Sequence, residues 1–291
     1  MGSSYCGSTV LGMVLGAEAN VYNAGEINKY PHAACGPKIE RHQDGILPTC
    51  TCGLPIKECD FWGRLKSSQF RSLDQKDKPG FSLENIKLAG QILLPAFKMY
   101  DRNEMSIEYE HLVMRVYQIA REMDPDVEWI VDGSKSLQPL YWLAESSQVK
   151  VKVIHLFRSP ISALNSFKKH GYGFLYGLIA WVFVNYLGRR YLQRAGLPFL
   201  SMSYGDLCQD TESQFLRLNA FLDLDMHTQT YIENVNTTEY HLFSGNPLLS
   251  KGVDFSGLSY QSGTAHLSKK EYHLAKSLNP IHRRMIQGEN L

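Results

Sequence analysis

The chain begins with MGSSYCGSTVLGMVL, residues 1–15, where a turn of small residues leads directly into an apolar helical run. Such a turn leaves backbone N–H groups unpaired, and the helix dipole adds about half a positive charge at the same end. Together they can hold an anion. Gly2 and Gly7 have the spacing of the triphosphate-binding motif G-x-x-x-x-G-K-[ST], but Ser8 replaces its lysine. The stretch therefore predicts a site for a single 5′-phosphate; an ordinary helix-capping Gly/Ser turn is the alternative.

Downstream of this turn, strand and helix patterns alternate. Strands are predicted at 127–131, 151–157 and 199–203, and helices at 8–16, 82–95, 106–123, 139–146 and 211–222. In the helix over 106–123 the predicted buried stripe is Ile107, Leu112, Val116, Ile119 and Met123. The alternation predicts one α/β domain over residues 1–291, with a P-loop-like parallel β-sheet flanked by helices on both faces.

Two stretches depart from this alternation. Residues 31–79 are rich in Pro, Gly, Cys and charge, and are interpreted as an irregular insertion. Residues 174–184 are free of charge, but they are fewer than the roughly twenty that a membrane-spanning helix needs. They are predicted to form a buried helix, or alternatively to line an apolar acceptor pocket.

Polar residues gather where the predicted strands end. These clusters are 2–9, 132–135, 158–159 and 204–206, although no strand precedes the first. Ligands of parallel sheets bind beyond the carboxyl ends of the strands, so the clusters are expected to form one site. Arg158 ends a strand and Ser166 lies about two helical turns later, so a guanidinium fork and a hydroxyl can reach one phosphate. Two phosphate sites predict a nucleotide phosphorylated at two positions.

The cysteines suggest a small structural site. There are six, too few for a disulfide scaffold, and Cys50, Cys52 and Cys59 lie close together. Structural zinc normally takes four nitrogen or sulfur ligands. The predicted fourth ligand is Cys35, His32 or His42, and the alternatives are a local disulfide or three reduced thiols.

Composition limits the partners and the location. Hydrophobic residues make up 44% and charged residues 20%, which is typical of a soluble globular protein. The net charge of +1 implies no bulk attraction to nucleic acid or to an anionic membrane. No signal-peptide pattern opens the chain. A cytoplasmic protein is therefore expected, although the triplet at 236–238 is a weak glycosylation signal.

Several segments together resemble the sulfotransferases that use 3′-phosphoadenosine 5′-phosphosulfate (PAPS), in particular their bacterial branch. Residues 2–11 are similar to the 5′-phosphosulfate loop G-x-P-R-S-G-[ST]-T-x-L, and Arg158 with Ser166 is similar to the 3′-phosphate motif R-x-P-x(5)-S. Further similar segments, in the family's order, are 132–135 ((D)-S-S-K-S), 204–207 (Y-E-D-L), 241–247 (H-x(3)-G-N-P) and 50–62 (C-x-C-G-x(5)-C-x-F-W). The resemblance covers most of the chain.

Three features depart from the family pattern. Tyr5 stands where the loop usually has arginine, so a cation is missing near the transferring group. Leu249 replaces an arginine that often follows G-N-P, with Lys251 as a possible substitute. The strand that normally leads into the loop is absent from the start of the sequence.

The resemblance implies roles for individual residues. Lys135 is expected to stabilise the transferring group, Glu26 to act as the general base, and His241 to be the competing candidate for that base. The residues expected to bind PAPS are Ser4, Tyr5, Cys6, Gly7, Ser8, Thr9, Arg158, Ser166, Tyr204 and Lys251. The transfer itself requires no metal, because neither product is a polyphosphate.

The predicted function is transfer of a sulfuryl group from PAPS to an acceptor hydroxyl or amine. The acceptor is expected to be a small molecule, a lipid or a glycan. One alternative is a P-loop kinase, which Ser8 disfavours. The other is a nucleotide-binding protein that has lost turnover, which Tyr5 and the missing first strand favour.

Overall fold

Two pairs of short parallel strands form the centre of the described part of the chain. The computed structural model describes residues 1–35, 46, 49–66, 69–70, 73, 83–94, 104–245, 255–260 and 263–288. β1 (Val21–Asn23) pairs with β2 (Trp129–Val131), and β3 (Val153–Phe157) pairs with β4 (Phe199–Ser203). In this part of the chain the strands make two separate sheets rather than the single P-loop-like sheet that we expected. β1 and β2 have only three residues each, which limits the backbone hydrogen bonds they can make.

Met1 lies along β3 as a strand residue would. Its amino group donates to the carbonyl oxygen of Ile154 at 2.7 Å, and its carbonyl oxygen accepts from the N–H of Leu156 at 2.9 Å. The chain then continues from this pairing into the predicted anion-binding turn. Met1 therefore holds the start of the turn beside the strand that ends at Phe157.

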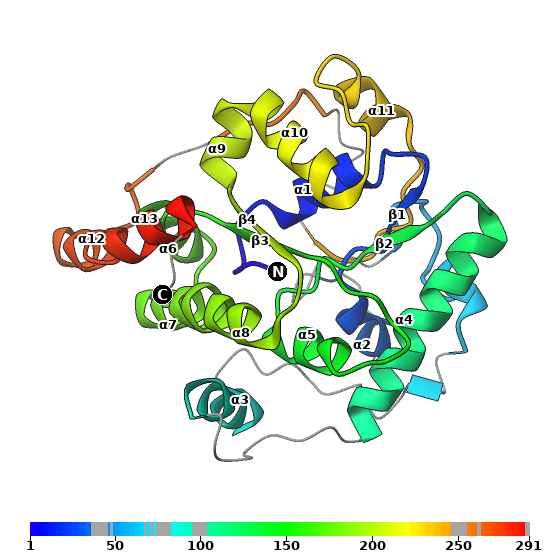
Figure 1. Ribbon diagram of the computed structural model, residues 1–291, viewed down its shortest axis with the longest axis horizontal. Coiled ribbons are helices and arrows are strands. Elements are labelled where there is room, and N and C mark those ends of the chain that lie inside the picture. Colours follow the sequence, from blue (N-terminus) through cyan, green and yellow to red (C-terminus); the bar gives the residue numbers. More distant parts are fainter. Residues whose placement is uncertain are drawn as a thin grey trace.

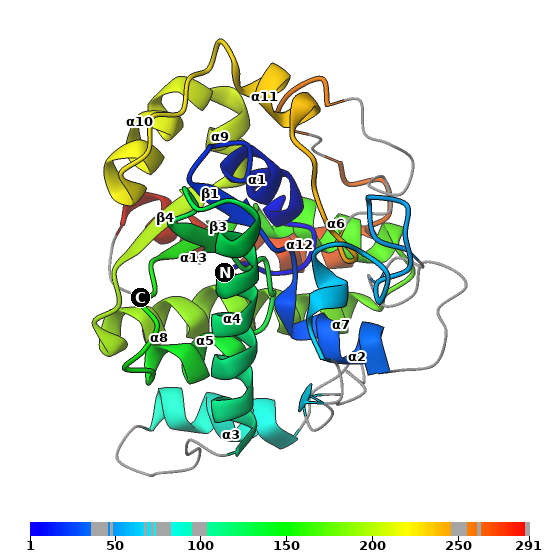
Figure 2. The ribbon, with the colours of Figure 1, turned by 90° about the vertical axis from the view of Figure 1, so that its right-hand side faces the viewer.

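Helices cover both sides of the strands (Figure 1). They are α1 (Ser8–Leu15), α2 (Tyr30–Cys35), α3 (Leu83–Leu93), α4 (Glu104–Met123), α5 (Leu137–Ala144), α6 (Pro160–Lys169), α7 (Phe174–Val182), α8 (Gly188–Ala195), α9 (Tyr204–Gln209), α10 (Thr211–Leu222), α11 (Tyr231–Thr237), α12 (Lys269–Lys276) and α13 (Asn279–Gln287). In both ribbon views α1, α9, α10 and α11 lie on one side of the strands, whereas α5, α7 and α8 lie on the other (Figure 1, Figure 2). The predicted mixture of strands with helices on both faces is confirmed.

Most predicted elements lie where the sequence pattern placed them. β4 and α10 have the predicted bounds, while α1, α3, α4, α5, β2 and β3 differ from prediction by a few residues at an end. The predicted buried stripe of α4 is wrong at both ends, because Ile107 and Met123 are 46% and 38% exposed. The buried face of α4 instead includes Tyr109 and Val113.

The charge-free run over 174–184 is not a uniformly buried helix. Leu175 is 66% exposed, whereas Trp181 is fully buried. The α-helix ends at Val182 and continues as a π-helical turn, η4 (Phe183–Leu187). Among the described residues, no helix combines the length and apolarity needed to cross a membrane.

The predicted insertion contributes to the core. Within its described residues, Phe61 and Trp62 are fully buried, and Trp62 begins the short helix η2 (Trp62–Arg64). Tyr30 stacks on Trp62 with ring centroids 5.3 Å apart. These aromatic rings bury large apolar areas, so this segment helps to hold the fold together and is not only a surface loop.

Candidate functional site

The predicted anion-binding turn leads into α1. Gly7, directly before the helix, has a left-handed backbone with a φ of 94°, and Tyr5 has a φ of 64°. Within the described residues no side chain caps α1, and its first turn has no acidic residue. The positive end of the helix dipole therefore has no acidic partner within its own first turn, which favours an external anion there. A Cβ at Gly7 would lie 2.3 Å from the ring of Tyr204, so glycine is required where this ring packs against the turn.

Arg158 connects this turn to the second predicted phosphate site. Its Nη1 donates to the carbonyl oxygen of Tyr5 at 3.3 Å and to Oγ of Ser166 at 3.3 Å. Trp181 fixes the backbone of Arg158, because its Nε1 donates to the Arg158 carbonyl oxygen at 3.0 Å. Two segments 153 residues apart in sequence are thus in direct contact at the predicted anion sites.

Tyr260 completes this region, although its sequence position gave no signal. The guanidinium carbon of Arg158 lies 5.3 Å from the centre of the Tyr260 ring, a cation–π arrangement. The hydroxyl of Tyr260 lies 3.2 Å from Oγ of Ser159 and 3.1 Å from Oγ of Ser162. Tyr260 therefore supports the end of β3 and the start of α6, where Arg158 is located.

Tyr5 lies among aromatic rings. It stacks on His170 with centroids 4.6 Å apart and an interplanar angle of 7°, and it meets Phe167 edge-on at 5.1 Å. Burial and the neighbouring Tyr172 raise the pKa of Tyr5 well above its usual value. Tyr5 is therefore a neutral residue that shapes the turn, and it does not replace the arginine of the resembling loop.

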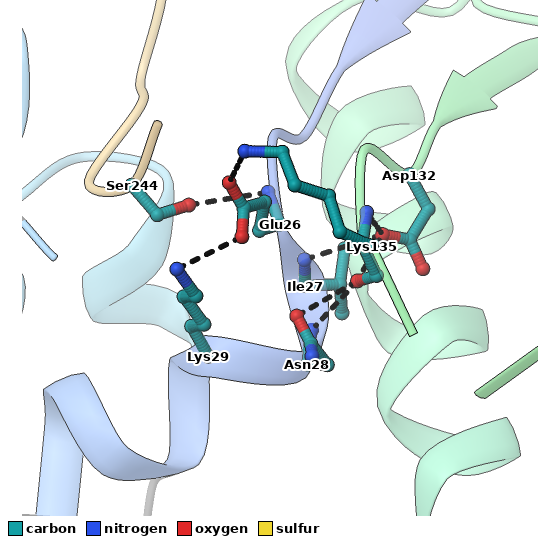
Figure 3. A network of polar contacts seen from close by, with 8 residues as sticks. Glu26, Ile27, Asn28, Lys29, Asp132, Lys135 and Ser244 are labelled. Atoms are coloured by element: carbon teal, nitrogen blue, oxygen red, sulfur yellow. Dashed lines mark hydrogen bonds and ion pairs between the residues drawn. The ribbon is translucent and has the colours of Figure 1, made fainter. Parts of the chain in front are cut away.

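Glu26 and Lys135 form an ion pair (Figure 3). Nζ of Lys135 lies 2.8 Å from Oε1 of Glu26, and Nζ of Lys29 lies 2.9 Å from Oε2. Burial alone would raise the pKa of Glu26, but Lys135 and Lys29 lower it to about 2. Burial alone would lower the pKa of Lys135, but Glu26 raises it above its usual value. The structure thus brings together the predicted base and the predicted stabilising cation as a charged pair.

A buried carboxylate, Asp132, holds these segments together. It accepts hydrogen bonds from the backbone N–H of Ser134 at 2.8 Å, the hydroxyl of Tyr109 at 2.7 Å and the N–H of Ile27 at 3.4 Å. Burial raises the pKa of Asp132, and these hydrogen bonds oppose the rise. They fix the residues before Lys135 against the residues after Glu26 (Figure 3).

A small cavity joins the anion-binding turn to the ion pair. Its lining includes Ser8 and Thr9 from the start of α1, and Glu26 and Gly133 from the region of the ion pair. The other lining residues are Gly12, Asn23, Gly25, Leu242 and Ser244. Oγ of Ser244 accepts a hydrogen bond from the N–H of Glu26 at 3.2 Å. The start of α1 and Glu26 therefore border the same small space.

The remaining predicted site residues occupy different places. Cys6 is fully buried, so its side chain supports the turn from inside. Ser4 is half-buried in the turn. Lys251 lies outside the described residues. The ring of His241 is turned toward Cys59, with Nδ1 3.3 Å from Sγ, whereas Glu26 pairs with Lys135.

The predicted cysteine cluster is present, but its fourth member differs from our expectation. Cys50, Cys52, Cys59 and His241 place one possible ligand atom each within 4.8 Å of one another. The predicted fourth ligand was Cys35, His32 or His42, of which His42 lies outside the described residues. His241 lies 182 positions after Cys59 in the sequence, so the spacing of the cysteines could not predict that His241 joins the group.

Comparison with known proteins gives two distant structural similarities. No protein-family profile and no curated protein sequence match the chain. The sulfotransferase domain from the curacin biosynthetic pathway superposes with a TM-score of 0.45 at 12% identity, covering 96% of this chain and 95% of that domain. The sulfotransferase domain from the Synechococcus PCC 7002 olefin synthase superposes with a TM-score of 0.43 at 18% identity, covering 96% and 92%. The functional assignment therefore depends on the residues of the site.

Proposed function

We propose that the protein is a sulfotransferase that moves a sulfuryl group from PAPS to an acceptor hydroxyl or amine. The observation that carries the proposal is the contact of Arg158 with both Ser166 and the turn before α1. The 3′- and 5′-oxygens of a nucleotide belong to one ribose, so their phosphates need two anion sites that lie close together. In this assignment Arg158 and Ser166 hold the 3′-phosphate, while the start of α1 holds the 5′-phosphate.

Glu26 and Lys135 have complementary roles in the proposed reaction. The acceptor oxygen forms a bond to sulfur while the bond between sulfur and the 5′-phosphate oxygen breaks. The acceptor proton passes to Glu26, and the electron pair of the broken bond stays on the 5′-phosphate. Lys135 stabilises the negative charge on the transferring group and on the leaving oxygen.

The Glu26–Lys135 ion pair must change during this cycle. A carboxylate with a pKa of about 2 is a weak base at neutral pH. An anionic co-substrate would attract Lys135, and the pKa of Glu26 would rise as it loses that partner. The ion pair therefore keeps Glu26 ionised before the co-substrate binds, and binding makes it a stronger base beside the cavity.

Nucleotide binding tests the proposal directly. Adenosine 3′,5′-bisphosphate should raise the melting temperature, because a ligand that binds only the folded state stabilises it. Arg158→Ala should abolish the shift, whereas Arg283→Ala, at an exposed position on α13, should retain it. An equal response to ATP with magnesium would favour a kinase. The absence of any response to the bisphosphate would refute the proposal.

Transfer is tested with labelled PAPS and panels of phenolic, lipid and glycan acceptors. Glu26→Gln should keep the bisphosphate-induced shift and lower transfer by about a hundredfold to ten-thousandfold. Unchanged transfer would remove Glu26 from the mechanism. Nucleotide binding without transfer to any acceptor would instead support a binding protein that has lost turnover.

A further inference from the structure

Four potential metal ligands from distant parts of the chain converge beside the proposed reaction site. Sγ of Cys59 lies 3.6 Å from Sγ of Cys50 and 3.3 Å from Nδ1 of His241. With Cys52, all four ligand atoms lie within 4.8 Å of one another. In tetrahedral zinc sites with bonds of about 2.0 to 2.3 Å, neighbouring ligand atoms are roughly 3.4 to 3.8 Å apart. The two separations at Cys59 are close to that geometry, and the remaining pairs would have to shorten from at most 4.8 Å.

The backbone around the cysteines is built to present them together. The N–H of Gly53 donates to the carbonyl oxygen of Cys50 at 2.9 Å, and the N–H of Cys50 donates to the carbonyl oxygen of Leu54 at 2.9 Å. Gly53 has a φ of 86°, a backbone conformation that residues other than glycine rarely adopt. This tight turn places Cys50 and Cys52 beside Cys59. Cys50, Cys59 and His241 are buried, and Cys52 is half-buried, so the protein shields most of the group from water.

We propose that Cys50, Cys52, Cys59 and His241 form a structural Zn²⁺ site. Three thiolates and one imidazole are a common set for structural zinc, and with four protein ligands no position remains for a reacting water. A Glu239 carboxylate oxygen lies 3.9 Å from Nε2 of His241, which is beyond hydrogen-bond distance. In this assignment His241 is a metal ligand rather than the general base.

The zinc site would stabilise the segment that lines one side of the cavity beside Glu26. The N–H of Thr51 donates to the carbonyl oxygen of Leu242 at 2.8 Å, and Nε1 of Trp62 donates to the carbonyl oxygen of His241 at 2.6 Å. Leu242 and Ser244 line the cavity, and Ser244 contacts the backbone of Glu26. Zinc would therefore tie the cysteine segment to the strip of chain that positions Glu26.

Metal content is the direct test. The full chain, purified under reducing conditions and dialysed, should contain about one zinc per molecule by mass spectrometry. Cobalt exchanged into the site should give the absorption bands of a tetrahedral cobalt–thiolate centre. Cys52→Ser should lower the affinity for zinc by about tenfold or more, whereas Cys208→Ser should leave it unchanged. These readouts do not depend on nucleotide binding or transfer, so they can fail separately from the proposed function.

Substitutions at His241 test whether it acts as a metal ligand or as the general base. His241→Cys should retain zinc because a fourth thiolate can replace the imidazole, and His241→Ala should lose it. Protein that is metal-free, fails to take up zinc or cobalt after reduction, and keeps its melting temperature with a strong chelator would overturn the proposal. A Cys50–Cys59 disulfide found by mass mapping of the protein as purified without reductant would overturn it as well.

Discussion

Replacement of Glu26 by glutamine should make the protein markedly less stable at neutral pH. The two lysines lower the pKa of Glu26 from 4.5 to about 2 in the folded state. Each pKa unit corresponds to about 1.4 kcal/mol, so the ionised carboxylate adds on the order of 3 kcal/mol to the free energy of unfolding. For a chain of this size, that loss lowers the melting temperature by roughly 5 to 10 °C.

The pH dependence gives the decisive readout. A folded-state pKa below the unfolded value means that this stabilisation is complete above pH 4.5 and is lost as pH falls toward about 2. Melting temperatures of wild type and Glu26→Gln, measured by differential scanning fluorimetry between about pH 7 and pH 3, should therefore converge on acidification. At about pH 3 less than half of the difference should remain.

The Lys168–Glu271 pair provides a matched control. Its N–O distance is also 2.8 Å, but it lies nearer the surface, where solvent screens the charges. Glu271→Gln keeps a residue that can serve the capping box of α12. It should shift the melting temperature much less than Glu26→Gln does. A constant difference between wild type and Glu26→Gln from neutral to acidic pH would refute the argument, because the loss would then not come from the ionised carboxylate.

Three further substitutions test the proposed nucleotide site. Gly7→Ala should destabilise the protein by at least about 2 kcal/mol in denaturant unfolding. Alanine would have to adopt an unfavourable φ of 94°, and its Cβ would lie 2.3 Å from the ring of Tyr204. An unchanged unfolding midpoint would contradict this turn geometry. Trp181→Phe should weaken bisphosphate binding severalfold in calorimetry, since it removes the buried donor to Arg158 at 3.0 Å. Ser166→Ala should lower affinity for adenosine 3′,5′-bisphosphate by about tenfold while affinity for adenosine 5′-monophosphate stays the same; an equal loss for both would move Ser166 away from the 3′-phosphate.

Local chemistry determined much of what the sequence predicted. α10 and β4 have their predicted bounds because the spacing of apolar residues and the flanking polar residues act within a few positions. The turn before α1 was predictable for the same reason, since Gly7 and the helix that follows are adjacent in sequence. The buried residues of α4 were less predictable. The face that a helix buries depends on which elements pack against it.

Long-range packing decided the composition of the site. His241 joins the cysteines, and Tyr260 lies over Arg158, although local spacing links neither to its partners. Glu26 acquires a pKa of about 2 only because folding places Lys135, 109 positions later, against it in a buried setting. The sequence by itself determined which elements form and where an anion can bind, because those properties come from neighbouring residues. Only the tertiary structure decided which charges, rings and thiols meet, because the path of the whole backbone sets those distances.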